Sequence, residues 1–164
     1  MDKLIIKGGS KISGSVNVHG SKNAALPIIV SSLLSEKTLK LSNVPNVVDV
    51  LNLIKLLKNY GVKIEHKKNK LNINPSKIKN LSADYDVVRK MRASILILGP
   101  LLSRFGEARI SLPGGCAIGT RPIDIHLAGL SKLGASFDIQ NGFVVGSVKS
   151  QLIGNKIKLP FPSV

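Results

Sequence analysis

Apolar residues recur along this chain at helical and strand spacings, in the order helix, strand, helix, hairpin. Spacings of three and four residues mark the helices, and alternation marks the strands. Gly61 is expected to end the second helix as a C-cap. The predicted elements are a helix from about 21 to 34, a strand at 38–41, a helix at 47–60 and a hairpin with strands 62–65 and 71–73. The predicted buried stripes are Leu26, Val30, Leu33 and Leu34 on the first helix and Val47, Val50, Leu51, Ile54 and Leu57 on the second.

The same order of elements returns in the second half of the chain. A repeated order predicts repeated units that share one core. We therefore expect two units, at about 21–80 and 81–150, the start of a third at 151–164, and two short strands at 4–6 and 14–18 before them. The elements of the second unit are a helix over 85–102 that Pro100 kinks or ends early, a strand at 109–112, a helix from Pro122 to Gly134 with the stripe Ile123, Leu127 and Leu130, and a hairpin around Asn141-Gly142.

Two helix starts carry recognisable capping residues. Ser21 or Asn23 can cap the first helix, which places Lys22 at or just before its N-terminus. Backbone N–H groups there attract anions, and a lysine strengthens the attraction. The alternative is an ordinary surface lysine in a cap. The segment 46–49 resembles a capping box for the second helix, with aspartate in place of glutamate.

Charge and cysteine content narrow the functional classes. The net charge is +15, which invites a nucleic-acid partner, but the excess is mostly lysine and aromatic residues make up only 4% of the chain. An anionic small substrate suits the same charge. One cysteine allows no internal disulfide, and no apolar run is long enough to cross a bilayer. We expect a cytoplasmic protein that binds neither nucleic acid nor membrane.

The cysteine lies in a glycine-rich segment, 111–124. Gly114, Gly115 and Gly119 flank Cys116, and Arg121 follows it. A thiol on an uncrowded loop beside a guanidinium is in the setting that lowers its pKa and makes it reactive. The alternative is a small buried hydrophobe, the role of most lone cysteines in intracellular proteins.

Three segments together resemble a known family. They are 21–27 (SKNAALP), 91–94 (MRAS) and 112–126 (LPGGCAIGTRPIDIH). These residues are similar to the MurA type of enolpyruvyl transferase, the UDP-N-acetylglucosamine 1-carboxyvinyltransferases, and the similarity runs through the whole chain. The resemblance implies an inside-out α/β barrel of mixed α/β (α+β) class, built from units of two helices and a four-stranded sheet. It assigns residues 1–20 to the first, discontinuous domain and 21–164 to the second.

The resemblance implies a reaction and a set of site residues. The enolpyruvyl group of phosphoenolpyruvate passes to the 3-hydroxyl of UDP-N-acetylglucosamine, with release of phosphate, at the start of peptidoglycan synthesis and hence of cell-wall growth and division. No cofactor or metal is implied, and the complete enzyme is mainly monomeric. Cys116 is the expected proton donor and the residue that fosfomycin alkylates, with an aid to product release as its alternative role. The expected substrate-binding residues are Lys22, Asn23, Arg92, Arg121, Pro122, Asp124, His126, Ser163 and Val164, of which Lys22, Arg92 and Arg121 also serve catalysis.

The same resemblance places the general base and a further arginine beyond residue 164. We therefore expect a part of a longer enzyme that is inactive and poorly stable alone. Two alternatives stay open: a catalytically inactive substrate-binding remnant, and a basic RNA-associated module.

Overall fold

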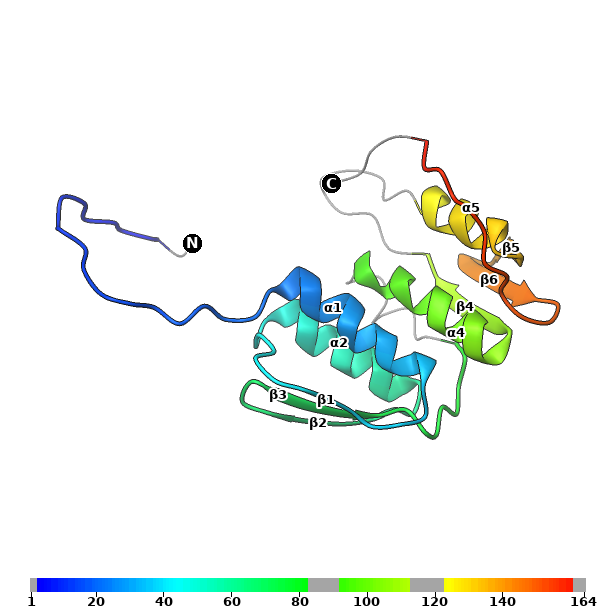
Figure 1. Cartoon of the computed structure of the whole chain (residues 1–164), viewed down its shortest axis with the longest axis horizontal. Coiled ribbons are helices and arrows are strands. Elements are labelled where there is room, and N and C mark those ends of the chain that lie inside the picture. The colour runs from blue at the N-terminus through cyan, green and yellow to red at the C-terminus, as the bar shows by residue number, and fades with distance from the viewer. Residues whose placement is uncertain (1–2, 83–91, 113–122, 161–164) are drawn as a thin grey trace.

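The first unit contains two helices and a three-stranded sheet. The computed structural model describes residues 3–82, 92–112 and 123–160 of the 164-residue chain. Figure 1 shows the helices of this unit lying over its sheet. The elements are α1 (Lys22–Ser31), the 3-10 turn η1 (Ser32–Leu34), β1 (Leu39–Leu41), α2 (Val48–Asn59), β2 (Lys63–Lys67) and β3 (Lys70–Asn74).

The second unit repeats this order. Its elements are the 3-10 helix η2 (Arg92–Ile97), α4 (Leu98–Phe105), β4 (Glu107–Ser111), α5 (Asp124–Lys132), β5 (Ala135–Gln140) and β6 (Phe143–Val148). The predicted hairpin turn is confirmed, because Asn141 and Gly142 both have positive φ angles, 50° and 78°, as a type I′ turn requires. Gly61 and Gly134 likewise follow the ends of α2 and α5 with φ angles of 92° and 100°.

The two sheets have the same strand order, which confirms the internal repeat. The first is β1-β3-β2 and the second is β4-β6-β5, and every pairing within them is antiparallel. Each sheet contains three strands within the described residues, where the resemblance implies four. Beside β4, however, Ser82 forms a parallel bridge with Arg109, so the chain leaving the first unit extends the second sheet at its β4 edge.

Both units contribute to one apolar core. Buried residues from α1, α2 and the first sheet form a single cluster with those from η2, α4 and the second sheet. α4 contacts η1 as well as its own strands β4 and β6, so it joins the two units. By contrast, α5 contains no fully buried residue, and its stripe of Ile123, Leu127 and Leu130 is only partly covered.

The predicted strands near the N-terminus are wrong. Residues 3–20 contain no helix or strand, and their apolar side chains are exposed, with Leu4 at 87% and Ile12 at 96%. A strand needs a neighbour for its backbone groups, and no described segment pairs with these residues. The segment 151–160 also lacks regular structure, although Ile153 N–H donates to the Leu133 carbonyl at 2.8 Å.

Three predicted helix boundaries also differ from the structure. Val47, without a side-chain hydrogen bond, occupies the N-cap of α2, so the capping box at 46–49 is wrong. α5 begins at Asp124 rather than at Pro122, which lies outside the described residues. Pro100 does not end its helix early, because α4 starts at Leu98 and continues to Phe105. Pro100 therefore lies in the first turn of α4, which follows the 3-10 helix η2 without a break.

Candidate active site

The N-terminus of α1 is capped as the sequence predicts. The Ser21 hydroxyl accepts a hydrogen bond from the Ala24 N–H at 3.4 Å, and the Ser21 carbonyl accepts one from the Ala25 N–H at 2.9 Å. Lys22 is consequently the first residue of the helix, and Asn23 follows it with an exposed side chain. The backbone N–H groups of this first turn give the end of α1 a partial positive charge.

A tight backbone contact fixes the entry to α1. The Gly20 N–H donates to Asn43 Oδ1 at 3.2 Å, and a Cβ atom on Gly20 would lie 1.9 Å from the Asn43 carbonyl oxygen. No side chain fits there, so position 20 requires glycine. The Val44 N–H donates in turn to the Asn69 carbonyl at 2.8 Å, so the approach to Lys22 is tied to the β2–β3 hairpin.

The Lys22 ammonium forms an ion pair with Asp49. Lys22 Nζ lies 2.7 Å from Asp49 Oδ2, and the two side chains are 48% and 38% exposed. Asp49 lies in the first turn of α2, so the pair joins two neighbouring helix N-termini. Sequence reasoning missed this partnership, since it assigned Asp49 to a capping box. The sequence signal that could have indicated this ion pair is an acidic residue at the start of a predicted helix.

The remaining described site residues lie on two further elements, η2 and α5. Arg92 begins η2, which packs against both α1 and α2. Asp124 and His126 lie in the first turns of α5 with exposed side chains. Figure 1 shows α1 and α2 over the first sheet, and α5 beside β5 and β6. The structure thus brings Lys22, Asn23 and the element that begins with Arg92 together, whereas Asp124 and His126 lie on α5, which contacts β5 of the second unit.

Other predicted site residues lie outside the described part of the chain. They are Cys116, Arg121, Pro122, Ser163 and Val164, together with the side chain of Arg92. β4 ends at Ser111 and α5 begins at Asp124, so the cysteine segment connects this strand to this helix. Its predicted roles stay predictions.

Residues 3–82, 92–112 and 123–160 contain no cluster of three or more His, Cys, Asp or Glu side chains that could hold a metal ion. The same ranges include no helix with the length and apolar character needed to cross a membrane.

A polar depression of about 250 Å³ lies on the first sheet, lined by Thr38, Lys40, Lys63, Glu65, Asn72 and Asn74. Its lining alternates with the buried Leu71 and Ile73, so it faces away from the core and from Lys22.

A family model and solved structures place the chain in a known class. Residues 6–164 match the family model of EPSP synthase (3-phosphoshikimate 1-carboxyvinyltransferase), so the chain belongs to this family. Solved structures agree on the fold. The enolpyruvyl transferase NikO from Streptomyces tendae superposes with a TM-score of 0.74 at 20% identity, covering 89% of this chain and 32% of that one. An EPSP synthase from Acinetobacter baumannii superposes with a TM-score of 0.67 at 20% identity, covering 92% and 35%.

Within this family the chain is similar to one particular enzyme. It is 54% identical to the UDP-N-acetylglucosamine 1-carboxyvinyltransferase of Campylobacter hominis over 156 residues, which are 93% of this chain and 37% of the relative. It is 47% identical to the corresponding enzyme 1 of Halalkalibacterium halodurans over 165 residues, covering all of this chain and 38% of the relative. The chain therefore spans somewhat more than a third of the length of these relatives.

Proposed function

We propose that this chain forms part of an enolpyruvyl transferase that acts on phosphoenolpyruvate and UDP-N-acetylglucosamine. A bond forms between the sugar 3-oxygen and the enolpyruvyl carbon, the bond from that carbon to phosphate breaks, and the hydroxyl proton is released. The observation that carries this proposal is the 54% identity to a UDP-N-acetylglucosamine 1-carboxyvinyltransferase over 93% of the chain. The reaction would serve peptidoglycan synthesis in the cytoplasm, in a mainly monomeric enzyme.

The end of α1 suits an anionic substrate. Phosphoenolpyruvate carries a carboxylate and a phosphate, which need cationic and N–H donors. Lys22 and the N–H groups of the first turn of α1 offer both within one small region. Asn23, beside Lys22, would contact the sugar nucleotide. Arg92 begins η2, an element in contact with α1, and in this proposal its guanidinium shares the substrate charges.

The cysteine segment supplies the remaining groups of the proposed site. Arg121 holds phosphate or carboxylate with Lys22 and Arg92. Cys116 donates a proton to the methylene of phosphoenolpyruvate as the sugar oxygen adds, since a thiol near cations can exchange a proton at neutral pH. The resulting methyl group loses a proton when phosphate leaves, so the double bond forms again. Pro122, Asp124 and His126 receive the uridine diphosphate, and Ser163 and Val164 begin the turn that binds its pyrophosphate. The connection from β4 to α5 would close over the substrates and exclude water.

A chimera tests the proposal, because the chain spans 37% of its Campylobacter hominis relative. Residues 1–164 would replace the matching part of that enzyme. We expect the chimera to release phosphate from phosphoenolpyruvate only with UDP-N-acetylglucosamine present, and to form the enolpyruvyl sugar nucleotide by mass spectrometry. Fosfomycin should add to Cys116, faster with the sugar nucleotide bound.

Matched variants separate chemistry from folding. Lys22→Ala should lower kcat/KM at least about 100-fold, the typical cost of one transition-state donor. Cys116→Ser should abolish labelling by fosfomycin. Lys158→Ala removes one positive charge from the exposed segment after β6 and should keep full activity. A folded chimera that forms no enolpyruvyl product would refute the proposed function.

A further inference from the structure

Lys22 occupies an electrostatically unfavourable position. A cation in the first turn of a helix faces the positive end of the helix dipole. The N-terminus of α2 lies beside that of α1, as the contact between Lys22 and Asp49 requires, and adds a second positive helix end. An acidic group nearby offsets these charges while no anionic ligand is bound.

Asp49 is that acidic group. Its own place in the first turn of α2 is favourable for a carboxylate. The acidic Glu36 pairs instead with Arg104, at the far end of α1. Asp49 thus makes the ion pair that the structure gives Lys22 among the described residues, at 2.7 Å.

We infer that Asp49 is a resident counter-ion, which orients the Lys22 ammonium in the free protein and is displaced from it by an anionic ligand. This inference rests on the proposed function, since it takes Lys22 to bind phosphoenolpyruvate. The pair is about half-exposed, so it is weak enough to exchange. A doubly charged phosphate competes well for the ammonium, while a singly charged anion gains little over the carboxylate it replaces. Asp49 would therefore favour dianionic ligands.

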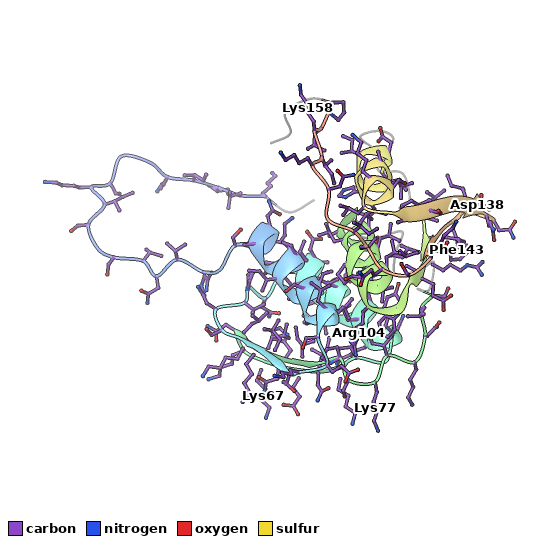
Figure 2. All side chains as sticks on the ribbon, turned by 45° about the vertical axis from the view of Figure 1, so that its right-hand side comes forward. Lys67, Lys77, Arg104, Asp138, Phe143 and Lys158 are labelled. Carbon is purple, nitrogen blue, oxygen red and sulfur yellow. The ribbon has the colours of Figure 1, made fainter. Side chains whose placement is uncertain are left out.

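A titration with inorganic phosphate tests the exchange. The amide signals of Lys22, Asn23 and Ala24 would report binding to the 164-residue chain by NMR. We expect Asp49→Asn to lower the Kd for phosphate about two- to five-fold, the range set by one exposed ion pair. Asp49→Glu should restore the original affinity. Asp138→Asn makes the same charge change on the second-unit hairpin, far from α1 in Figure 2, and should leave the affinity unchanged.

Repeating the Asp49→Asn change in a protein that already carries Lys22→Ala shows whether Asp49 acts through Lys22. In Lys22→Ala, the Asp49→Asn change should no longer tighten phosphate binding. An equal gain in both backgrounds would mean a diffuse charge effect, and unchanged or weaker binding in Asp49→Asn would also overturn the inference.

Calorimetric titration of the chimera with phosphate repeats the measurement in a longer protein. A folded but inactive chimera would refute the proposed function, whereas an active one without the Asp49 effect would refute this inference alone.

Discussion

At the scale of single residues, Tyr60 stands out because its polar group is buried. The residue caps the C-terminus of α2 and is completely inaccessible to solvent. Its hydroxyl has no hydrogen-bond partner among the described residues. Burial disfavours the phenolate and raises the pKa of Tyr60 above its usual value of 10. The side chain belongs to the apolar core, where its unpartnered hydroxyl costs stability.

Replacement of this hydroxyl should stabilise the protein, increasingly at high pH. We expect Tyr60→Phe to raise the free energy of unfolding at pH 7 by about 1 kcal/mol, by removing an unsatisfied buried group. Because the folded-state pKa is raised, the stability of the parent is complete below pH 10 and falls above it, by roughly 1.4 kcal/mol per pH unit, as the unfolded phenol ionises.

Urea unfolding of both proteins between pH 7 and 11 provides the measurement. The stability difference between them should widen above pH 10, while lysine titration, common to both, cancels. A constant difference across this range would show that the Tyr60 hydroxyl is hydrated in the folded state.

At the scale of elements, the helix ends decide how each unit is built. Gly61 follows α2 with a φ angle of 92°. The Gly61 N–H donates to the Lys58 carbonyl at 2.9 Å, and the Val62 N–H donates to the Leu57 carbonyl at 3.2 Å. These two bonds form a Schellman motif, which reverses the chain into β2. The chain after the first sheet passes close by, and a Cβ on Gly61 would lie 2.8 Å from the Lys77 carbonyl oxygen.

Two glycine substitutions should therefore have opposite effects. Gly61→Ala forces a left-handed backbone on a residue with a Cβ and creates a clash, so we expect a loss of about 1–2 kcal/mol. Gly99→Ala lies in α4 with no atom within 4 Å of the added Cβ, and should gain about 0.5–1 kcal/mol. Thermal unfolding followed by circular dichroism compares them. Equal shifts of the same sign would contradict this account of the α2 terminus.

At the scale of the whole molecule, Arg104 links the two units. It lies on α4, and its Nη1 donates to the carbonyls of Leu33, Ser35 and Pro75 at 3.2–3.3 Å. Its Nη2 donates to Glu36 at 3.0 Å. Figure 2 shows Arg104 within the body of the molecule, while Lys67 and Lys77 project from its outer side. The side chain is 14% exposed, whereas that of Glu36 is 78% exposed.

The carbonyl contacts, rather than the ion pair, should carry the stability of this link. Arg104→Lys cannot reproduce the fork of donors, and we expect it to cost about 1–3 kcal/mol. Glu36→Gln removes an exposed charge and should change stability by less than about 0.5 kcal/mol. Urea midpoints of the two variants test the difference. A larger loss for Glu36→Gln than for Arg104→Lys would reverse this ranking.

The element order was predictable because it depends on local spacing, but the buried faces were not. Leu53 and Leu56 are fully buried although neither belonged to the predicted stripe, because α2 packs against α1, β2 and η2 at once. Leu34 is exposed although it was predicted to be buried, because η1 turns the chain away from the helical face. Lys22 was placed correctly from its cap, whereas Asp49 as its partner was not.

The sequence by itself determined the repeat, the turn glycines, the cap before Lys22 and the family to which the chain belongs, because each depends on nearby residues or on a continuous motif. Only the tertiary structure decided that Lys22 meets Asp49, that Gly20 lies against Asn43 and that Arg104 joins the units. These contacts link residues distant in the chain, and the packing of helices on one another and on the sheets sets their distances. The exposed apolar residues before α1 also show the effect of tertiary structure. Their spacing predicts strands, but a strand forms only where a neighbouring strand pairs with it.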